Sequence, residues 1–336
     1  MTKEAMLYEK LEDGNVRCYL CGHRCKIAPT RRGICGVREN RDGILYTLVY
    51  GMVIAENVDP IEKKPLFHVW PGSRSFSIAT VGCNFSCIFC QNNDISQKPR
   101  ETGEITGREV TPEDIVEKAV RTKSKTIAYT YTEPTIFFEY AYDISSIAHK
   151  REIKNVFITN GFMTVEAIDK ISPYLDAANV DLKSFSSDFY EKKCGGRLQP
   201  VLDSLRKMKE LGIWVEVTTL IIPTLNDTEE ELRQIAEFIL SLGSETPWHI
   251  SRFHPQYKMV DLPLTPVETI HRAAEIGKEV GLKYVYSGNV PGDVGENTLC
   301  YNCGNLLIDR YGFVINRIDL QESRCPKCGT PLDGIL

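Results

Sequence analysis

The chain has 336 residues, 42% of them apolar, so it can bury a sizeable hydrophobic core. Its formal net charge of −5 gives no broad positive surface for nucleic acid or for an anionic membrane. The first residues are charged, and no run approaches about 18 consecutive apolar residues, so neither a signal peptide nor a membrane span is predicted. We therefore expect a cytoplasmic protein whose partners are neither nucleic acid nor membranes.

Twelve cysteines are present, which is a large number for a cytoplasmic protein. Because a reducing cytosol keeps thiols free, metal binding explains them better than disulfides do. They fall into three groups, and only Cys194 stands apart from the others. Such clustering is typical of metal sites, and an even distribution along the chain would not be.

The first group lies near the N-terminus and offers four thiolates in a short segment: Cys18, Cys21, Cys25 and Cys35. Four ligands close a metal site without outside help, and so short a segment needs a metal to fold, so zinc is the favoured occupant. An auxiliary iron–sulfur cluster is the alternative, because four cysteines also suit iron. We assign residues 1–70 to this N-terminal metal-binding segment.

The second group, Cys83, Cys87 and Cys90, is the most informative feature of the sequence. Its C-x₃-C-x₂-C spacing presents three thiolates, and soft thiolates favour iron–sulfur clusters, zinc or cuprous copper. A structural zinc site normally has four protein ligands, so a local trio is unusual for zinc unless a distant residue completes it. A cubane cluster has four irons, so three cysteines leave one iron free for a ligand that is not protein.

From residue 75 onward, short β-branched or aromatic runs alternate with amphipathic runs, which predicts strands alternating with helices. Three helices are predicted to begin at Thr111, Asp227 and Thr265, where capping residues precede the apolar periodicity. Such alternation with short connections indicates an α/β fold with a parallel sheet, here a partial (β/α)₆ barrel over residues 71–290. The six predicted strands are 75–82, 126–131, 155–159, 178–182, 214–221 and 248–253.

Polar residues follow four of these strands, at the edge where β/α barrels carry their chemistry. Each residue alone has a structural explanation, as a helix cap, a turn, a satisfied histidine or a solvated charge. Four strand ends that behave alike favour a binding site instead. A buried carboxylate would suit an ammonium group of the ligand, and a lysine would suit its carboxylate. The candidates are Tyr131, Thr132, Glu133, Thr159, Asn160, Asp181, Lys183 and His254.

The isolated Cys194 precedes two glycines in a predicted strand–helix connection. A lone cysteine is usually a small buried hydrophobic residue, and that is the favoured interpretation here. The alternative is a catalytic thiol that contacts substrate or relays a radical.

The last group consists of two C-x-x-C-G pairs and predicts a zinc ribbon in residues 291–336. Its four thiolates leave no coordination position open, so we expect a structural zinc rather than a catalytic one. The segment has no basic run that would favour nucleic acid. The predicted ligands are Cys300, Cys303, Cys325 and Cys328.

The motif at Cys83 resembles the radical S-adenosylmethionine (SAM) superfamily. The resemblance implies that a [4Fe–4S] cluster binds SAM through its open iron and cleaves it reductively. The 5′-deoxyadenosyl radical so formed would abstract hydrogen from a substrate that the sequence does not identify. An external reductant such as ferredoxin or flavodoxin is implied as well.

A closer resemblance covers nearly the whole chain and points to the radical SAM enzymes of the AmmeMemoRadiSam system. It implies Memo-family and AMMECR-family proteins as partners. The matching stretches are 59–68 (DPIEKKPLFH), 82–85 (GCNF), 90–92 (CQN), 129–134 (YTYTEP), 181–185 (DLKSF), 194–198 (CGGRL) and 251–255 (SRFHP).

More distantly the chain resembles pyruvate formate-lyase activating enzymes. That resemblance implies SAM contacts at Asn92, Thr159, Asp181, Lys183 and His254. The pattern differs where residues 131–133 (YTE) replace Gly-Gly-Glu and where an isoleucine at 158 replaces an acidic residue. Two alternatives remain: an activase that acts on a glycyl-radical protein, and a non-catalytic protein in which all three cysteine groups hold zinc.

Overall fold

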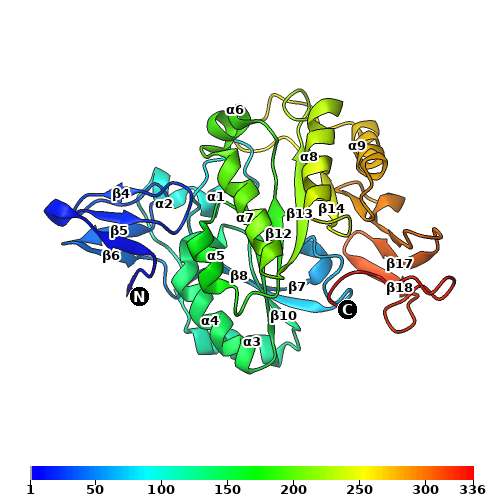
Figure 1. The fold of residues 1–336 in the computed structure, drawn as a ribbon. Coiled ribbons are helices and arrows are strands. Elements are labelled where there is room, and N and C mark those ends of the chain that lie inside the picture. The colour runs from blue at the N-terminus through cyan, green and yellow to red at the C-terminus, as the bar shows by residue number, and fades with distance from the viewer. Residues whose placement is uncertain (1) are drawn as a thin grey trace.

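The computed structural model describes residues 2–336, and its centre is a nine-stranded sheet (Figure 1). Seven strands run parallel, in the order β15-β14-β13-β12-β11-β10-β8. Two antiparallel strands, β7 and then β9, extend the sheet beyond β8. The bounds are β7 (Met52–Pro60), β8 (Arg74–Thr80), β9 (Arg108–Glu109), β10 (Thr126–Tyr129), β11 (Lys154–Thr159), β12 (Ala177–Asp181), β13 (Trp214–Ile221), β14 (Trp248–Arg252) and β15 (Val285–Gly288).

The predicted α/β fold with a partial (β/α)₆ barrel is confirmed. Six strand–helix units lead from β8 to β14, and the sheet stays open because β15 and β9 form its two edges. All six predicted strands are present, and the short β15 adds a seventh parallel strand that the sequence did not indicate. The α-helices are α1 (Asn93–Ser96), α2 (Lys98–Glu101), α3 (Pro112–Arg121), α4 (Phe138–Lys150), α5 (Val165–Ile171), α6 (Ser187–Phe189), α7 (Leu198–Glu210), α8 (Glu229–Leu242) and α9 (Val267–Val280).

The predicted capping residue is correct for one of the three helices. Thr111 caps α3 as predicted, and its hydroxyl accepts a hydrogen bond of 3.1 Å from the amide three residues on. Asp227 was the wrong choice for α8, because Thr228 is the capping residue. Thr265 does not cap α9 either. Its hydroxyl donates to the Ile221 carbonyl at 2.6 Å and so joins the start of α9 to the end of β13.

The N-terminal part forms two small three-stranded sheets beside the barrel (Figure 1). A fully buried ion pair anchors this part to α4, with Arg38 Nη2 2.8 Å from Glu139 Oε1. Burial of such a pair requires that both partners remain, because either charge alone would be costly in the interior. The strands are β1 (Lys3–Glu4), β2 (Tyr8–Lys10), β3 (Val16–Cys18), β4 (Lys26–Ile27), β5 (Arg38–Arg41) and β6 (Ile44–Thr47).

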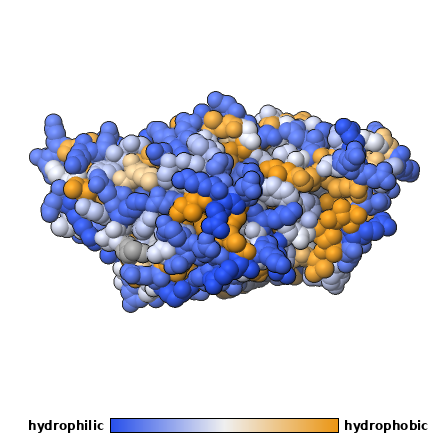
Figure 2. Space-filling model, turned by 90° about the horizontal axis from the view of Figure 1, so that it is seen from below, coloured by the Kyte–Doolittle hydropathy of each residue, from blue (hydrophilic) through white to orange (hydrophobic). Residues whose placement is uncertain are grey.

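The C-terminal part lies at the opposite end and is a small antiparallel sheet of β16 (Thr298–Leu299), β17 (Leu306–Tyr311) and β18 (Val314–Ile318) (Figure 1). Figure 2 shows apolar side chains gathered toward this end, where Tyr311, Phe313 and Val314 are exposed. After the second cysteine pair the chain returns to the barrel. There the amide of Trp70 donates to the Ile335 carbonyl at 2.7 Å. No helix in residues 2–336 is both long and apolar enough to cross a membrane.

Candidate active site

A cavity of about 520 Å³ opens at the C-terminal ends of the parallel strands. This is the edge at which β/α barrels carry their functional residues. The structure brings eleven of the sequence-predicted residues together in its wall: Cys83, Cys87, Cys90, Asn92, Tyr131, Thr132, Glu133, Thr159, Asn160, Asp181 and Lys183.

The three cysteines of this cavity lie in the loop that follows β8. Cys83 Sγ accepts hydrogen bonds from the Phe85 amide at 3.4 Å and from Asn160 Nδ2 at 3.7 Å, and Cys90 Sγ lies 3.2 Å from Ser96 Oγ. Donors of this kind stabilise sulfur ligands of an iron–sulfur cluster. Burial raises the pKa of the Cys83 and Cys90 thiols, so a bound metal would be needed to hold them as thiolates. The residues present therefore fit a cluster.

The glycines after Cys194 explain how this loop keeps its shape. Gly195 adopts a positive φ of 71°, and a Cβ on it would lie 2.3 Å from Ser86 Oγ. The backbone of this segment also pairs directly with the loop, since the Ser86 amide donates to the Cys194 carbonyl at 2.8 Å. Cys194 itself is fully buried and does not line the cavity. Hydrogen bonding to Cys194, together with burial, raises the pKa of the Cys87 thiol.

Glu133 is almost fully buried, and protein donors occupy its carboxylate. Oε1 accepts from the Thr135 amide at 3.0 Å, the Thr135 hydroxyl at 2.5 Å and the Thr159 hydroxyl at 2.7 Å. Oε2 accepts from the Asn160 amide at 2.8 Å. Three of these bonds end on Oε1 and one on Oε2, and burial raises the pKa of Glu133. Glu133 therefore ties the loop after β10 to the end of β11, and its Oε2 keeps an acceptor site in the cavity wall.

Lys183 is a cation of the cavity wall that lies close enough to Cys87 and Cys90 for its charge to act on them. Its Nζ lies 2.8 Å from Asp181 Oδ2, and Lys183 is the more buried of the two side chains. Burial opposes the charge on Lys183, but the Asp181 carboxylate outweighs burial and raises the pKa of Lys183 well above the usual value. Lys183 is therefore positively charged at neutral pH and faces the cavity.

A second charged pair, of which only Lys64 lines the cavity, was not assigned any role from the sequence. Lys64 Nζ lies 2.6 Å from Asp59 Oδ2 and 4.5 Å from the centre of the Tyr131 ring, and the Tyr131 hydroxyl donates to the same carboxylate. Burial lowers the pKa of Lys64 to about 8. Tyr131 has a positive φ of 62°, which these contacts and a 2.7 Å bond from Asn92 Nδ2 to its carbonyl hold in place. The stretch 59–64 (DPIEKK) was visible in the sequence only as part of a family pattern.

His254 is the one predicted cofactor residue that the structure leaves outside this wall. Its side chain is exposed, in the loop after β14, and it does not line the cavity. Ser251 and Asn289 line this side of the cavity instead, and Asn289 Nδ2 donates to Ser251 Oγ at 2.9 Å. Neither residue stood out in the sequence, because single polar residues near strand ends are common.

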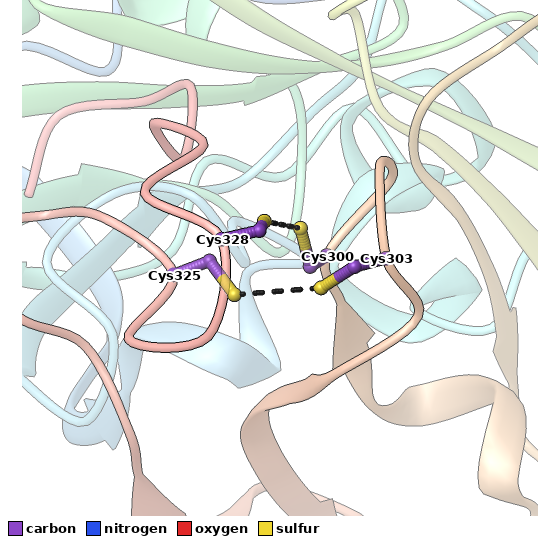
Figure 3. Close-up of side chains that lie close together, drawn as sticks. All are labelled: Cys300, Cys303, Cys325 and Cys328. Carbon is purple, nitrogen blue, oxygen red and sulfur yellow. Dashed lines mark hydrogen bonds between the residues drawn. The ribbon is translucent and has the colours of Figure 1, made fainter.

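The C-terminal cysteines converge tightly (Figure 3). The four sulfurs of this group all lie within 4.8 Å of one another. The Cys300–Cys328 and Cys303–Cys325 sulfur pairs are 3.6 and 3.7 Å apart. A tetrahedral zinc with Zn–S bonds of about 2.3 Å separates its sulfurs by about 3.8 Å, so the donor set fits one zinc ion.

The sequence model of the radical SAM superfamily matches residues 77–239. An uncharacterized protein of Methanocaldococcus jannaschii, MJ0808, is 50% identical over 338 residues, covering 99% of this chain and 100% of that protein. The pyruvate formate-lyase-activating enzyme of Clostridium pasteurianum is 23% identical over 190 residues, 55% of this chain and 76% of that enzyme. A radical SAM methyltransferase from Sphaerobacter thermophilus shares the fold, with a TM-score of 0.53 and 18% identity over 70% of this chain and 71% of that one.

The open parallel sheet, the cysteine loop after its first parallel strand and these matches define the class: the chain belongs to the radical SAM superfamily. Within it, the chain carries a radical SAM domain homologous to pyruvate formate-lyase activating enzymes. Membership implies an enzyme that uses a [4Fe–4S] cluster and SAM.

Proposed function

We propose that Cys83, Cys87 and Cys90 bind the catalytic [4Fe–4S] cluster and that SAM occupies the adjoining cavity. When bound, the two groups supply a 5′-deoxyadenosyl radical that abstracts hydrogen from the substrate. The observation that carries this proposal is the cavity itself: three thiols with sulfur-directed donors and eight predicted cofactor residues share one wall. A zinc site closed by a distant ligand would not require such a space.

The charges in the wall suggest how the methionyl end of SAM is held. Lys183 supplies a positive charge for the carboxylate, and the buried charge of Glu133 favours the ammonium group. Asp181 is more than a third exposed, so it has acceptor capacity left beside Lys183 for a ribose hydroxyl. Asn92 acts by holding the Tyr131 carbonyl in place, and Thr132, Thr159 and Asn160 order the strand ends around the ligand.

We also propose that Cys300, Cys303, Cys325 and Cys328 bind one structural zinc, on the strength of their tetrahedral spacing. The reductant is proposed to be a ferredoxin or flavodoxin in the cytoplasm. The sequence stretches shared with the AmmeMemoRadiSam family support a place in that system, together with Memo-family and AMMECR-family proteins.

The decisive test replaces Cys83, Cys87 and Cys90 together by alanine in anaerobically reconstituted protein. The wild type should form 5′-deoxyadenosine from SAM after reduction, and SAM should change the paramagnetic resonance spectrum of its reduced cluster. Both signals should vanish in the triple variant. Cys303→Ser is the matched control, since Cys303 does not line the cavity, and below its unfolding temperature this variant should keep both. Formation of 5′-deoxyadenosine by the triple variant would refute the assignment.

A further inference from the structure

The N-terminal cysteines enclose a space of their own. Cys18, Cys21, Cys25 and Cys35 line one apolar cavity of about 20 Å³. That volume admits the centre of a water-sized sphere among the four thiols. Four sulfurs gathered around a single zinc ion are in van der Waals contact with one another and leave no such space.

The two groups of four cysteines therefore differ in the same chain. Among residues 2–336, the Cys300 group is the one set of three or more His, Cys, Asp or Glu side chains whose ligand atoms all lie within 4.8 Å. Among the same residues, neither the N-terminal sulfurs nor those of Cys83, Cys87 and Cys90 form such a close set. A cubane places four irons and four sulfides between its thiolates, so its ligands must be spaced more widely than those of one metal ion.

We propose that Cys18, Cys21, Cys25 and Cys35 bind a second [4Fe–4S] cluster, and that electrons for the Cys83-group cluster enter the protein through it. The sequence alone had favoured zinc at these four residues. The electron-entry part rests on the proposed function, because it needs an electron acceptor at Cys83, Cys87 and Cys90. The presence of the second cluster does not.

The loops that carry the two cysteine groups touch each other. A Cβ on Gly82, which has a positive φ of 105°, would lie 2.7 Å from Val37 Cγ1 and 3.5 Å from the Cys35 carbonyl oxygen. His23 adds a direct link, because its Nε2 lies 2.8 Å from the carbonyl of Asn84, the residue after Cys83. The two ligand loops are therefore in direct contact. Such proximity suits electron transfer between clusters held by the two loops.

Charge supports electron entry at the N-terminal group. The segment from Arg17 to Arg38 contains six Arg and Lys residues and no Asp or Glu, although the whole chain has a net charge of −5. Arg38 is buried beside the group, but Glu139 balances its charge, so the exposed Lys26 and Arg31 carry the argument. These exposed residues attract an acidic carrier protein.

The electron balance is simple. A reduced one-electron carrier of the ferredoxin or flavodoxin type loses one electron, and the N-terminal cluster gains it. The same electron passes to the Cys83-group cluster and then into the bond between the sulfonium sulfur and the ribose carbon of SAM. That bond breaks to give methionine and the 5′-deoxyadenosyl radical, and no proton is transferred.

Metal analysis of the Cys83/Cys87/Cys90→Ala triple variant tests the second cluster without any change to the N-terminal residues. After anaerobic reconstitution it should retain about four irons and four sulfides per chain, with about one zinc. Its reduced spectrum should show a cluster signal that SAM leaves unchanged. An iron-free variant with about two zinc ions would overturn the proposal. A failed radical SAM assignment would show instead as a wild type that never cleaves SAM, so the two failures are distinguishable.

Reduction kinetics test electron entry. In Cys21→Ala/Cys25→Ala, SAM cleavage driven by reduced flavodoxin should slow by about tenfold or more, whereas cleavage driven by dithionite should persist. The matched control is Asp188→Ala/Lys192→Ala, which changes two exposed residues outside the cavity and outside both cysteine groups. Lys26→Glu/Arg31→Glu changes exposed residues only, and it should raise the KM for flavodoxin by about tenfold at low salt while dithionite-driven cleavage is unchanged. Flavodoxin-driven rates equal to those of the wild type in both variants would overturn electron entry at this group.

Discussion

Lys183 shows how a single residue takes its character from its neighbours. A lysine this deep in a protein would ordinarily lose its charge, but Asp181 at 2.8 Å keeps it protonated. The pair can still bind a ligand, because Asp181 is partly exposed and both side chains face the cavity. A ligand carboxylate can therefore share the cation without displacing its partner.

Lys183→Met should weaken SAM binding because it removes the charge and leaves Asp181 without its cation. A lost charged hydrogen bond costs about 1.5–3 kcal/mol, which is roughly ten- to a hundredfold in affinity. The measurement is a SAM titration followed by the paramagnetic resonance signal of the reduced cluster. Lys192→Met is the control, since Lys192 pairs with Asp188 in solvent and lies outside the cavity. An unchanged titration for Lys183→Met would place the methionyl carboxylate elsewhere.

Glu133→Gln should destabilise the protein as well as affect SAM. Glutamine would replace one carboxylate oxygen by an NH2 group, which cannot accept a hydrogen bond. If that group takes the place of Oε2, the Asn160 amide loses its acceptor, and if it takes the place of Oε1, the donors around Oε1 lose theirs. An unmade buried hydrogen bond of this kind costs about 1–3 kcal/mol, measured as the free energy of unfolding in urea. Glu166→Gln is the control, because Glu166 forms an exposed ion pair with Arg24. Full stability together with lost SAM binding would mean that Glu133 acts on the ligand alone.

The sequence revealed the cavity residues that sit within motifs, and it missed those that depend on distant partners. Cys83, Cys87 and Cys90 were identified by spacing, because the chemistry of the cluster dictates it. Lys64 gains its role from Tyr131, which is far away along the chain, and no local pattern marks such a contact. Only the fold brings the two together.

At the level of elements, strands with clean apolar runs were predicted and irregular ones were not. β13 is a long run rich in β-branched residues, and its predicted bounds were correct. Most side chains of β7 are partly or fully exposed, so this strand lacks the alternation of buried and exposed residues that marks a strand. β15 has only four residues and ends in glycine, so it is too short to be recognised. Thr265 was predicted to cap a helix because the local sequence fits a capping box. Its hydrogen-bond partner at the end of β13 is distant in the sequence, so no local pattern reveals it.

A buried polar network that the sequence did not predict lies near the first residues of β13, β14 and β15, at the end of the barrel that we call its floor. Glu216 on β13 accepts hydrogen bonds from the amides of Phe67 and His68, at 3.0 and 2.8 Å, and lies 2.6 Å from His249 Nε2. The His68 ring is also fully bonded. Its Nδ1 lies 2.6 Å from a backbone carbonyl, and its Nε2 lies 2.7 Å from the hydroxyl of Tyr286. A carbonyl accepts only, so Nδ1 donates, and in the neutral ring Nε2 then accepts from the Tyr286 hydroxyl.

This arrangement predicts an acid-sensitive fold. Burial lowers the pKa of His68 to about 4, whereas an unfolded chain has a histidine pKa near 6.5. Between those pH values the unfolded state takes up a proton that the folded state excludes. The contribution of His68 to the free energy of unfolding is therefore fully present above about pH 6.5 and falls as the pH drops toward 4. The loss is about 1.4 kcal/mol per pH unit from this residue.

Urea unfolding at several pH values checks that expectation. His68→Gln keeps one donor and one acceptor but cannot titrate, so the free energy of unfolding should fall less steeply with acid than in the wild type. His149→Gln is the matched control, because His149 is exposed at the end of α4 and should leave the slope unchanged. Equal slopes for the wild type and His68→Gln would show that other groups carry the acid response.

At the scale of the whole molecule, the two cysteine-rich parts flank the barrel on opposite sides (Figure 1). The sequence indicated them as separate segments because cysteine spacing marks their positions. It could not show how firmly they are joined to the barrel. Arg310 of the C-terminal sheet is almost fully buried, donates to the Phe67 carbonyl at 2.9 Å and lies 4.2 Å above the Phe67 ring. The ribbon thus completes the floor that holds His68 and Glu216.

Loss of the C-terminal zinc should therefore weaken the barrel as well as the ribbon. Cys300→Ser/Cys325→Ser should lower the zinc content by about one ion per chain, and structural zinc contributes folding free energy directly. Calorimetry should show one transition at a lower midpoint temperature, and the fluorescence of Trp70 and Trp214 beside the floor should change in the same transition. Tyr311→Ser, an exposed change in the same sheet, is the control and should leave the midpoint in place. A separate early transition that left the tryptophan signal untouched would mean that the floor stands without the ribbon.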